Sequence, residues 1–453
     1  MRHETIAALA TPRGISALAV IRVSGMLCGN LFESFAGIRK FSPETFHHRK
    51  YFSLAGELID DVLMVFFASP NSYSGEDSIE IYCHGNMLIV EKILVDLYSR
   101  GCCPAGPGEF TRRAFMNGKL DLSQAEAVAD VIHANSERAI AVAQNQLEGA
   151  LSEKINSIGK DLLSVLAEIE REIDFSDDEI LAENFPASIL GKLEKSSKEL
   201  ENLMESNRYR SLLDEGVSAI ILGEPNAGKS SLFNFLLGKD RAIVSEIAGT
   251  TRDIVSERIT IGNNVLKIFD SAGLHSNPMC KIEEIGIAKA IAAAKKADLF
   301  LIVLDSNAKR LPKIPREIAG LFQTSNALLV VNKVDLRRNC DSENFLTHLK
   351  RIEISIKNES DLQLLRNKIL EILNSNDSLN CDVDVIVNSR HVDILRRSHE
   401  LLLRAKSELE KKTNLEIIVS DIHQAFEILG EISGGYDRER VLDAVFANFC
   451  VGK

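Results

Sequence analysis

The sequence predicts a multidomain protein of α+β and α/β classes. We expect an N-terminal α+β domain, a discontinuous helical domain, and an inserted phosphate-binding domain with a doubly wound, mostly parallel sheet. Three observations support this. A loop of the pattern G-x-x-x-x-G-K-[ST] follows the apolar run 217–222. Strand-like and helical runs then alternate, which is typical of a parallel sheet. Helical apolar spacing precedes that region and helical segments follow it, so the phosphate-binding domain interrupts a helical one.

The N-terminal domain, residues 1–117, alternates short apolar runs with turns. Its strand-like runs are 17–23, 62–67 and 78–82. The run 88–98 has helical spacing. A segment dense in turn formers, 106–111, closes the domain. Arg22 and Glu80 are charged residues inside strand patterns, and the simplest interpretation is that both face solvent.

The helical domain is predicted in two parts, residues 118–214 and 377–453, on either side of the phosphate-binding domain at 215–376. Apolar residues recur at steps of three and four from Leu147 to Ile173, a stripe that needs a partner helix. Ser123 and Glu126 have the spacing of a capping box at a helix start. Further helices are expected over the following ranges: 186–207, 389–411, 416–429 and 437–449.

The phosphate-binding loop runs from Gly223 to Ser230, and a helix is expected from Ser231. Glycines let backbone N–H groups surround phosphate oxygens, and the helix N-terminus adds its positive end. Lys229 is expected to reach the β- and γ-phosphates, and the Ser230 hydroxyl to bind Mg²⁺.

The base is predicted to be guanine. Asn332-Lys333-Val334-Asp335 follows the apolar run 327–331, which places it at the carboxyl end of a parallel strand. The Asp335 carboxylate can accept from guanine N1–H and the 2-amino group, a donor pair that adenine lacks. By itself this segment is equally compatible with a solvated turn. Ser355-Ile356-Lys357 follows another strand-like run and is a weaker candidate for packing on the base.

The remaining parts of a nucleotide switch follow the same pattern. Asp270, at the end of a strand-like run, suits a water-mediated Mg²⁺ contact, and the Gly273 N–H suits the γ-phosphate. Thr251 is a second hydroxyl ligand for Mg²⁺. Leu274 stands where many small GTPases carry a water-orienting Gln, and no Arg is clearly placed as an arginine finger.

We hypothesise that K⁺ replaces the arginine finger. The Asn226 side-chain oxygen and carbonyls of the loop 245–250 are its candidate ligands. Glu283 is the candidate for orienting water, although the residue alone favours the interpretation as an ordinary exposed helix Glu.

Composition limits the remaining classes of function. The 453 residues are 45% hydrophobic and 26% charged, as in soluble globular proteins. A net charge of −12 argues against broad electrostatic binding of nucleic acid, though not against a local RNA contact. The 8 cysteines have no C-x-x-C pair, which favours reduced thiols in the cytosol. No apolar run approaches about 18 residues, so we expect no membrane span, and no signal peptide is recognised.

In the order of its motifs, essentially the whole chain resembles the tRNA modification GTPase family MnmE, also called TrmE. The resemblance rests on Pro-Gly-Glu-Phe-Thr at 107–111, Lys-Leu-Asp-Leu-Ser-Gln-Ala-Glu-Ala at 119–127 and Gly-Glu-Pro-Asn-Ala-Gly-Lys-Ser-Ser at 223–231. It also rests on Ile-Ala-Gly-Thr-Thr-Arg-Asp at 247–253 and the terminal Phe-Cys-Val-Gly-Lys at 449–453. The last of these, taken with the N-terminal motifs, is the most specific.

The resemblance implies a folate-binding, dimerising N-terminal domain, and a cytoplasmic K⁺-stimulated GTPase that modifies C5 of wobble uridine in tRNA. Its implied partners are a second copy of the chain, tRNA and the flavoprotein MnmG, also called GidA. It implies 5-formyltetrahydrofolate or a related one-carbon folate bound by Arg22, Glu80, Lys119 and Lys453. It assigns Mg²⁺ to Ser230 and Thr251, K⁺ to Asn226, Ser245, Ile247 and Thr250, and water orientation to Glu283.

The residues expected to contact GTP share their place in the nucleotide motifs. They are Asn226, Ala227, Gly228, Lys229, Ser230, Ser231, Ser245, Glu246, Ile247, Ala248, Gly249, Thr250, Thr251, Asp270, Ser271, Ala272, Gly273, Asn332, Lys333, Asp335, Ser355, Ile356 and Lys357. The alternative functions are a ribosome-assembly GTPase of the Era or Der type and a non-catalytic nucleotide-dependent scaffold.

Overall fold

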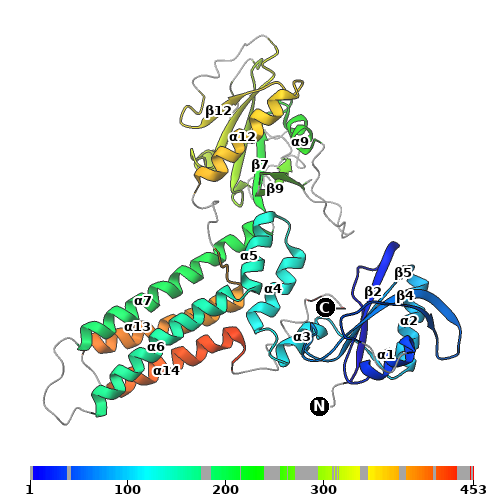
Figure 1. Ribbon diagram of the computed structural model, residues 1–453. Coiled ribbons are helices and arrows are strands. Elements are labelled where there is room, and N and C mark those ends of the chain that lie inside the picture. The colour runs from blue at the N-terminus through cyan, green and yellow to red at the C-terminus, as the bar shows by residue number, and fades with distance from the viewer. Residues whose placement is uncertain are drawn as a thin grey trace, which may run out of the picture. The chain divides into compact units, whose positions relative to one another are not determined.

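The structure is a computed structural model, and it divides the chain into two compact units (Figure 1). The first unit comprises Met1–Ala129, Gln146–Leu200 and Asp393–Lys453, and the second comprises Asp130–Asn145 and Glu201–Val392. The second unit therefore interrupts the first, as the sequence predicts. The structure describes residues 4–37, 42–174, 185–214, 216–238, 256–262, 264–270, 294–308, 311, 314, 316–336, 345–376, 384–411, 415–435, 449 and 452.

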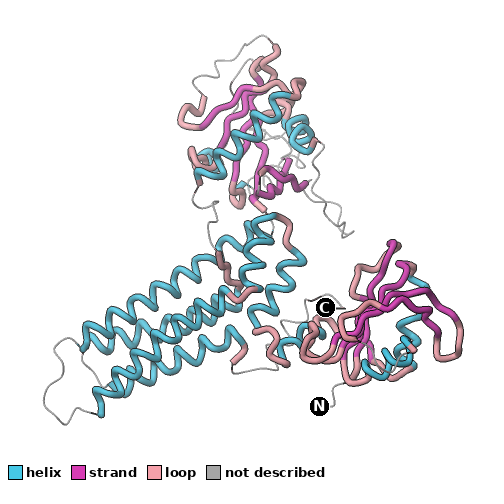
Figure 2. The backbone as a smooth tube through the Cα atoms, viewed as in Figure 1, coloured by secondary structure: helices cyan, strands magenta, loops and turns pink. Residues whose placement is uncertain are grey.

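The first unit begins with an α+β domain built on one mixed sheet (Figure 2). Its described strands lie in the order β3-β4-β5-β2-β1-β6, antiparallel except for the β1–β6 pair. Helices α1 and α2 cover one face and bury an apolar core with it. The elements are β1 (Ile6–Leu9), β2 (Ser16–Ser24), α1 (Cys28–Ala36), β3 (His47–Phe52), β4 (Leu58–Phe67), β5 (Ser78–Gly85), α2 (Met87–Ser99) and β6 (Cys103–Pro104).

Long helices form the rest of the first unit and continue into the second. Polar contacts join the long ones: Lys192 Nζ donates to Ser164 Oγ (2.8 Å), and Ser398 Oγ donates to the Ala425 carbonyl (3.0 Å). Their apolar stripes are buried where α6 packs on α14 (Figure 1). These helices are α3 (Glu109–Met116), α4 (Leu122–His133), α5 (Glu137–Leu147), α6 (Ala150–Asp174), α7 (Phe185–Ser206), α13 (Ser389–Glu410) and α14 (Leu415–Ser433).

Two local predictions in this region are wrong in detail. The predicted stripe from Leu147 to Ile173 is interrupted, because Gly149 has φ +101° and α6 begins only after it. The capping box lies two residues earlier than predicted: Asp121 Oδ1 accepts from the Gln124 N–H (2.9 Å), and Gln124 Oε1 accepts from the Asp121 N–H (2.9 Å). The hydroxyl of Ser123 instead donates to Asp121.

Two described residues near the C-terminal end, Phe449 and Gly452, contact helix α4 and strand β1. Phe449 is buried in a cluster with Leu122 and Val128 of α4. A Cβ on Gly452 would lie 2.2 Å from the Leu9 carbonyl oxygen, so the tail touches the end of β1. The segment predicted as a helix over 437–449 lies outside the described residues, except for Phe449.

The second unit contains a mostly parallel sheet with its described strands in the order β12-β11-β10-β7-β9-β8. β8 is antiparallel to β9, and the other pairs are parallel. The elements are η1 (Asn207–Tyr209), α8 (Arg210–Asp214), β7 (Val217–Gly223), α9 (Lys229–Leu237), β8 (Ser256–Ile261), β9 (Asn264–Asp270), β10 (Leu299–Asp305), α11 (Arg316–Ala319), β11 (Ala327–Asn332), β12 (Lys350–Glu353) and α12 (Ser360–Ser375).

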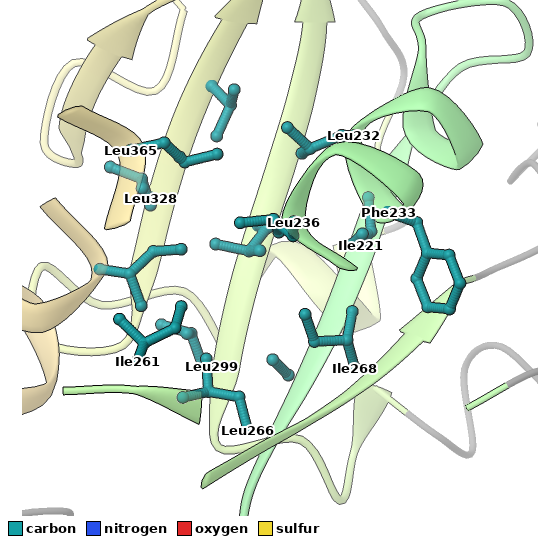
Figure 3. Packing of buried hydrophobic residues seen from close by; sticks show 14 of the residues in the cluster. Ile221, Leu232, Phe233, Leu236, Ile261, Leu266, Ile268, Leu299, Leu328 and Leu365 are labelled. Carbon is teal, nitrogen blue, oxygen red and sulfur yellow. The ribbon is translucent and has the colours of Figure 1, made fainter. Parts of the chain in front are cut away.

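Apolar cores cover both faces of this parallel sheet. Figure 3 shows Leu232 and Leu236 of α9 against strands that carry Ile221 and Leu299, and α12 packs on the same face. On the opposite face, Ile318 of α11 belongs to a second core. The predicted doubly wound sheet is confirmed, and its strand ends at one edge carry the nucleotide motifs.

The chain enters and leaves the second unit through neighbouring segments. Ser206 Oγ accepts from the Val387 N–H (3.2 Å), although the two residues are far apart in sequence. Val142, Tyr209 and Ile386 form a small buried cluster beside them. None of the described helices combines the length and the hydropathy that a bilayer span requires.

Candidate nucleotide-binding site

The phosphate loop lies between β7 and α9, as the motif predicts. Gly228 precedes the first residue of α9 and has φ +98°. A Cβ at Gly228 would lie 2.4 Å from Asn332 Nδ2, so a side chain there would displace the neighbouring motif. Lys229 is 7% exposed, and its Nζ donates to the Glu224 carbonyl at 2.9 Å. The loop is thus a compact turn at a helix N-terminus, where backbone N–H groups favour anions.

The Asn-Lys-x-Asp segment follows β11 and touches this loop past the end of β10, which lies between β11 and β7 in the sheet. Asn332 Nδ2 donates to the Ala227 carbonyl (3.1 Å), and Lys333 Nζ donates to the Asn226 carbonyl (2.7 Å). Asn332 Oδ1 is buried and finds no hydrogen-bond partner within the described part of the chain. A buried acceptor without a donor costs about 1–3 kcal/mol.

Two side chains clamp Asp335. Ser355 Oγ donates to its Oδ1 (2.8 Å), and Lys357 Nζ donates to its Oδ2 (2.9 Å). The Lys357 bond, followed by the Ser355 bond, holds the pKa of Asp335 below its ordinary value of 3.8. The carboxylate is therefore ionised at neutral pH, which is the state that accepts two N–H donors from guanine.

The backbone around Ser355 is fixed in turn by α12. Asp361 Oδ2 accepts from the Ser355 N–H at 2.8 Å, and Asp361 Oδ1 accepts from Asn358 Nδ2 at 2.9 Å. Ile356 packs at the edge of the core below. The phosphate loop, the Asn-Lys-x-Asp segment and the turn at Ser355 thus form one continuous edge at the carboxyl ends of the strands, where parallel sheets bind ligands.

A second polar cluster lies in the first unit, on the mixed sheet. Arg22 on β2 and Glu80 on β5 are directly opposite partners, and Arg22 Nη2 lies 2.7 Å from Glu80 Oε1. Their side chains are 19% and 15% exposed, so the interpretation that both simply face solvent is wrong. Tyr82 donates to Glu80 Oε2 at 2.7 Å. Burial, followed by this bond to Glu80, raises the pKa of Tyr82 to about 12.

Aromatic rings surround the cation of this pair. The Arg22 guanidinium carbon lies 5.2 Å from the Tyr73 ring centroid and 5.8 Å from that of Phe110. Tyr73 is fixed by its hydroxyl contact with Thr111 (2.8 Å), which belongs to the 107–111 motif. Lys119 Nζ donates to the Pro70 carbonyl at 3.0 Å.

Comparison with known proteins assigns both parts of the chain to one family. The GTP-binding protein TrmE N-terminus matches residues 5–119, and the MnmE helical domain matches residues 122–450. The tRNA modification GTPase MnmE of Opitutus terrae is 42% identical over 453 residues, covering 100% of this chain and 99% of the relative. That of Natranaerobius thermophilus is 38% identical over 461 residues, covering 100% of both.

This chain belongs to the tRNA modification GTPase MnmE family. The resemblance deduced from its motifs is confirmed. The G domain of the FeoB iron transporter of T. maritima is similar over 34% of this chain and 98% of its own, with 25% identity and a TM-score of 0.27. A likeness that limited carries no argument about function.

Several MnmE-type site residues predicted from the sequence lie outside what the structure describes. Asp270 ends β9 as expected, but only its backbone is described. The predicted residues outside the described ranges are Ser245, Glu246, Ile247, Ala248, Gly249, Thr250, Thr251, Ser271, Ala272, Gly273, Glu283 and Lys453.

Sequence reasoning missed two acidic residues beside the MnmE nucleotide site. Asp361 supports Ser355, and Asp305 Oδ2 lies 2.6 Å from Lys333 Nζ. Asp305 ends the apolar run 299–304, the same signal that located Asp270 and Asn332. The signal was present and was not applied to that strand.

Proposed function

We propose that this chain is a K⁺-stimulated GTPase that acts in C5 modification of wobble uridine in tRNA. It works with the flavoprotein MnmG and a one-carbon tetrahydrofolate, and the product is of the aminomethyl or carboxymethylaminomethyl type. Family membership supports the tRNA modification. The observation that carries the nucleotide part is the clamped Asp335 beside a phosphate loop that Asn332 and Lys333 hold.

Guanine selection follows from charge and hydrogen bonding. An ionised Asp335 accepts from N1–H and the 2-amino group of guanine. Adenine presents an acceptor where guanine presents N1–H, so it would leave the carboxylate without donors. Ile356 and Lys357 would cover the base, and Lys229 would reach the β- and γ-phosphates.

Two cations complete the proposed hydrolytic site. Mg²⁺ would be held by Ser230 and Thr251, and K⁺ by Asn226, Ser245, Ile247 and Thr250. The first of these, Ser230, is the second residue of α9, and Asn226 lies in the loop with φ +64°. When bound, the cations supply the positive charge that an arginine finger supplies elsewhere. Glu283 would orient the attacking water, because Leu274 has no polar group.

The folate site is proposed on the mixed sheet of the N-terminal domain. Arg22 and Glu80 offer a cation and a carboxylate among aromatic rings, which suits a polar heterocycle with an acidic tail. Lys119 and Lys453 are the further proposed contacts. Gly452 touches the end of β1, whose Ala8 pairs with Arg22, and this supports a role for the tail at that site.

We also propose the domain bounds, the oligomeric state, the partners and the cellular location of this chain. We divide the chain into an N-terminal domain (1–117), a GTPase domain (215–376) and a helical domain in two parts (118–214 and 377–453). The chain is proposed to work as a cytoplasmic homodimer and to bind MnmG and tRNA. GTP hydrolysis would drive a conformational cycle rather than the carbon chemistry itself.

The first experiment is nucleoside analysis of tRNA from a strain that lacks this gene. Loss of C5-modified wobble uridine is expected, with restoration by the wild-type chain and not by the Asp335→Asn variant. Normal tRNA together with stalled ribosomal subunits would instead favour a ribosome-assembly GTPase of the Era or Der type.

The hydrolytic site is tested by GTP turnover in KCl and in NaCl at equal ionic strength. Turnover is expected in K⁺ and is expected to fall strongly in Na⁺ and in the Glu283→Ala variant. Glu284→Ala is the matched control, because it removes a neighbouring carboxylate from the same segment. Equal rates in the two salts would contradict the K⁺ site, and an unaltered Glu283→Ala rate would contradict the role of Glu283.

A further inference from the structure

The Lys333 ammonium bridges two strand ends of the nucleotide edge. Its Nζ donates to the Asn226 carbonyl of the phosphate loop (2.7 Å) and lies 2.6 Å from Asp305 Oδ2. Asp305 ends β10, the strand next to β11. The Lys333 and Asp305 side chains are 31% and 19% exposed. An ammonium has three N–H donors, so these two contacts leave a third for a nucleotide.

The backbone of the same segment is held from β10 as well. Ser306 N–H donates to the Asn332 carbonyl (2.9 Å), and Ser306 Oγ donates to the Lys333 carbonyl (2.8 Å). Lys333 itself has φ +63°, a conformation that a non-glycine residue keeps only when its surroundings determine it. The end of β10 therefore fixes both the backbone and the side chain of Lys333.

We propose that Asp305 is a positioning residue for nucleotide binding. It directs the Lys333 ammonium onto the Asn226 carbonyl, so that Lys333 joins the phosphate loop to the base-reading segment. This rests on the proposed nucleotide site and adds a residue to it. Asp305 does not itself read the guanine, because Asp335 has that role.

The physical basis is the flexibility of lysine. Its four-carbon stem has about 2 kcal/mol of rotamer entropy, and a single carbonyl is a weak anchor for it. A carboxylate adds a charge-assisted bond of about twice the strength of a neutral one. Without Asp305, Lys333 would sample other rotamers, and the loop around Asn226 would lose a fixed contact.

A simpler role for Asp305 is to cap the turn that follows β10. Its Oδ1 accepts from the Asn307 N–H at 2.9 Å, and an Asn side chain can make that bond equally well. The Asp305→Asn variant therefore keeps the turn contact and removes the charge that attracts Lys333. This separates the two roles.

The test measures dissociation of a fluorescent GDP analogue from the full-length protein. Asp305→Asn is expected to raise the dissociation rate about tenfold, which corresponds to about 1.4 kcal/mol. The effect on the KM for GTP should exceed the effect on kcat. In the Lys333→Ala background, Asp305→Asn should add less than about a twofold change, because neighbours that act as one unit are not additive.

Asp298→Asn is the matched control. Asp298 immediately precedes β10 at the opposite end of the strand and accepts from the Ser218 N–H at 2.9 Å. The same substitution there should leave the dissociation rate unchanged. If the Lys333→Ala variant binds the GDP analogue too weakly to be measured, hydrogen exchange replaces the comparison of single and double variants. Asp305→Asn should then speed exchange of the loop amides 224–231 without changing that of β10.

The outcomes separate the inference from the function beneath it. A wild-type rate for Asp305→Asn, or a full additional effect in the Lys333→Ala background, would overturn the positioning role alone. Wild-type protein that binds no guanine nucleotide would overturn the proposed function together with this inference.

Discussion

The two sheets of this chain present functional side chains in different ways. In the parallel sheet of the second unit, the nucleotide residues lie in segments that follow strands, as Gly228 follows β7 and Lys333 follows β11. In the mixed sheet of the first unit, Arg22 and Glu80 lie inside adjacent strands, on the face opposite the apolar core.

That difference decides what a sequence pattern can reveal. A polar motif directly after a buried strand of a parallel sheet has one place to go, the carboxyl edge. A charged residue within an alternating strand has the same pattern whether it faces water or a ligand. The comparison teaches that strand-end residues can be assigned from sequence, whereas mid-strand residues need their cross-strand partner.

The largest expected effect is at the nucleotide edge. Asp335→Asn should weaken GTP binding about a thousandfold, because both donor bonds to guanine are affected. Xanthosine triphosphate, which has a carbonyl in place of the 2-amino group, should bind the variant better than GTP. Equilibrium binding of both nucleotides measures this. If the variant loses affinity equally for GTP and for xanthosine triphosphate, Asp335 has a structural role and does not contact the base.

The next effect concerns the cores beneath the two sheets. Leu236→Ala, at a fully buried position of α9 (Figure 3), should lower local stability by about 3 kcal/mol because it leaves a cavity. Hydrogen exchange of peptides from β7 and β10 measures the loss. Leu97→Ala is the matched change under the mixed sheet, where Leu97 is also fully buried. If each variant loosens both sheets, the division into two stability units is incorrect.

A smaller effect is expected at the mid-strand pair. Glu80→Gln leaves the half-buried Arg22 without its ionic partner and should lower the stability of the N-terminal domain by about 2 kcal/mol. Folate binding should weaken while GTP affinity stays unchanged. Glu57→Gln is the control, because the Glu57–Lys92 pair is largely exposed. Calorimetry and ligand titration separate this from the alternative, in which Glu57→Gln and Glu80→Gln have equal effects.

The smallest effect is a pH dependence that should be absent. The pKa of Asp335 is lowered, so its carboxylate loses charge only as pH falls through a value below 3.8. The ratio of GDP to inosine diphosphate affinity, in which phosphate titration cancels, should therefore be constant from about pH 7 to about pH 5. A ratio that falls across this range would mean that Asp335 has a raised pKa.

Sequence reasoning identified the fold class, the inserted domain and the nucleotide motifs because each has a local signature. It placed the helix start near Asp121 two residues too late, since Asp121 and Ser123 are both good capping residues. It could not show that Arg22 pairs with Glu80, because strand register depends on contacts distant in sequence. The Asp305–Lys333 contact is different, because Asp305 ends an apolar run and the strand-end signal that would have located it was not applied there.

The packing of α6 on α14 has a consequence for biosynthesis. Gly159 of α6 faces the Phe426 ring, and a Cβ there would lie 3.1 Å from it. Ribosomes add about 5–20 residues per second, so α6 waits tens of seconds for α14 while the inserted unit is translated. During that interval the apolar stripe of α6 is exposed to chaperones and to aggregation. If the inserted unit folds by itself, the nascent chain spends less time with both the inserted unit and the helical region around α6 unfolded.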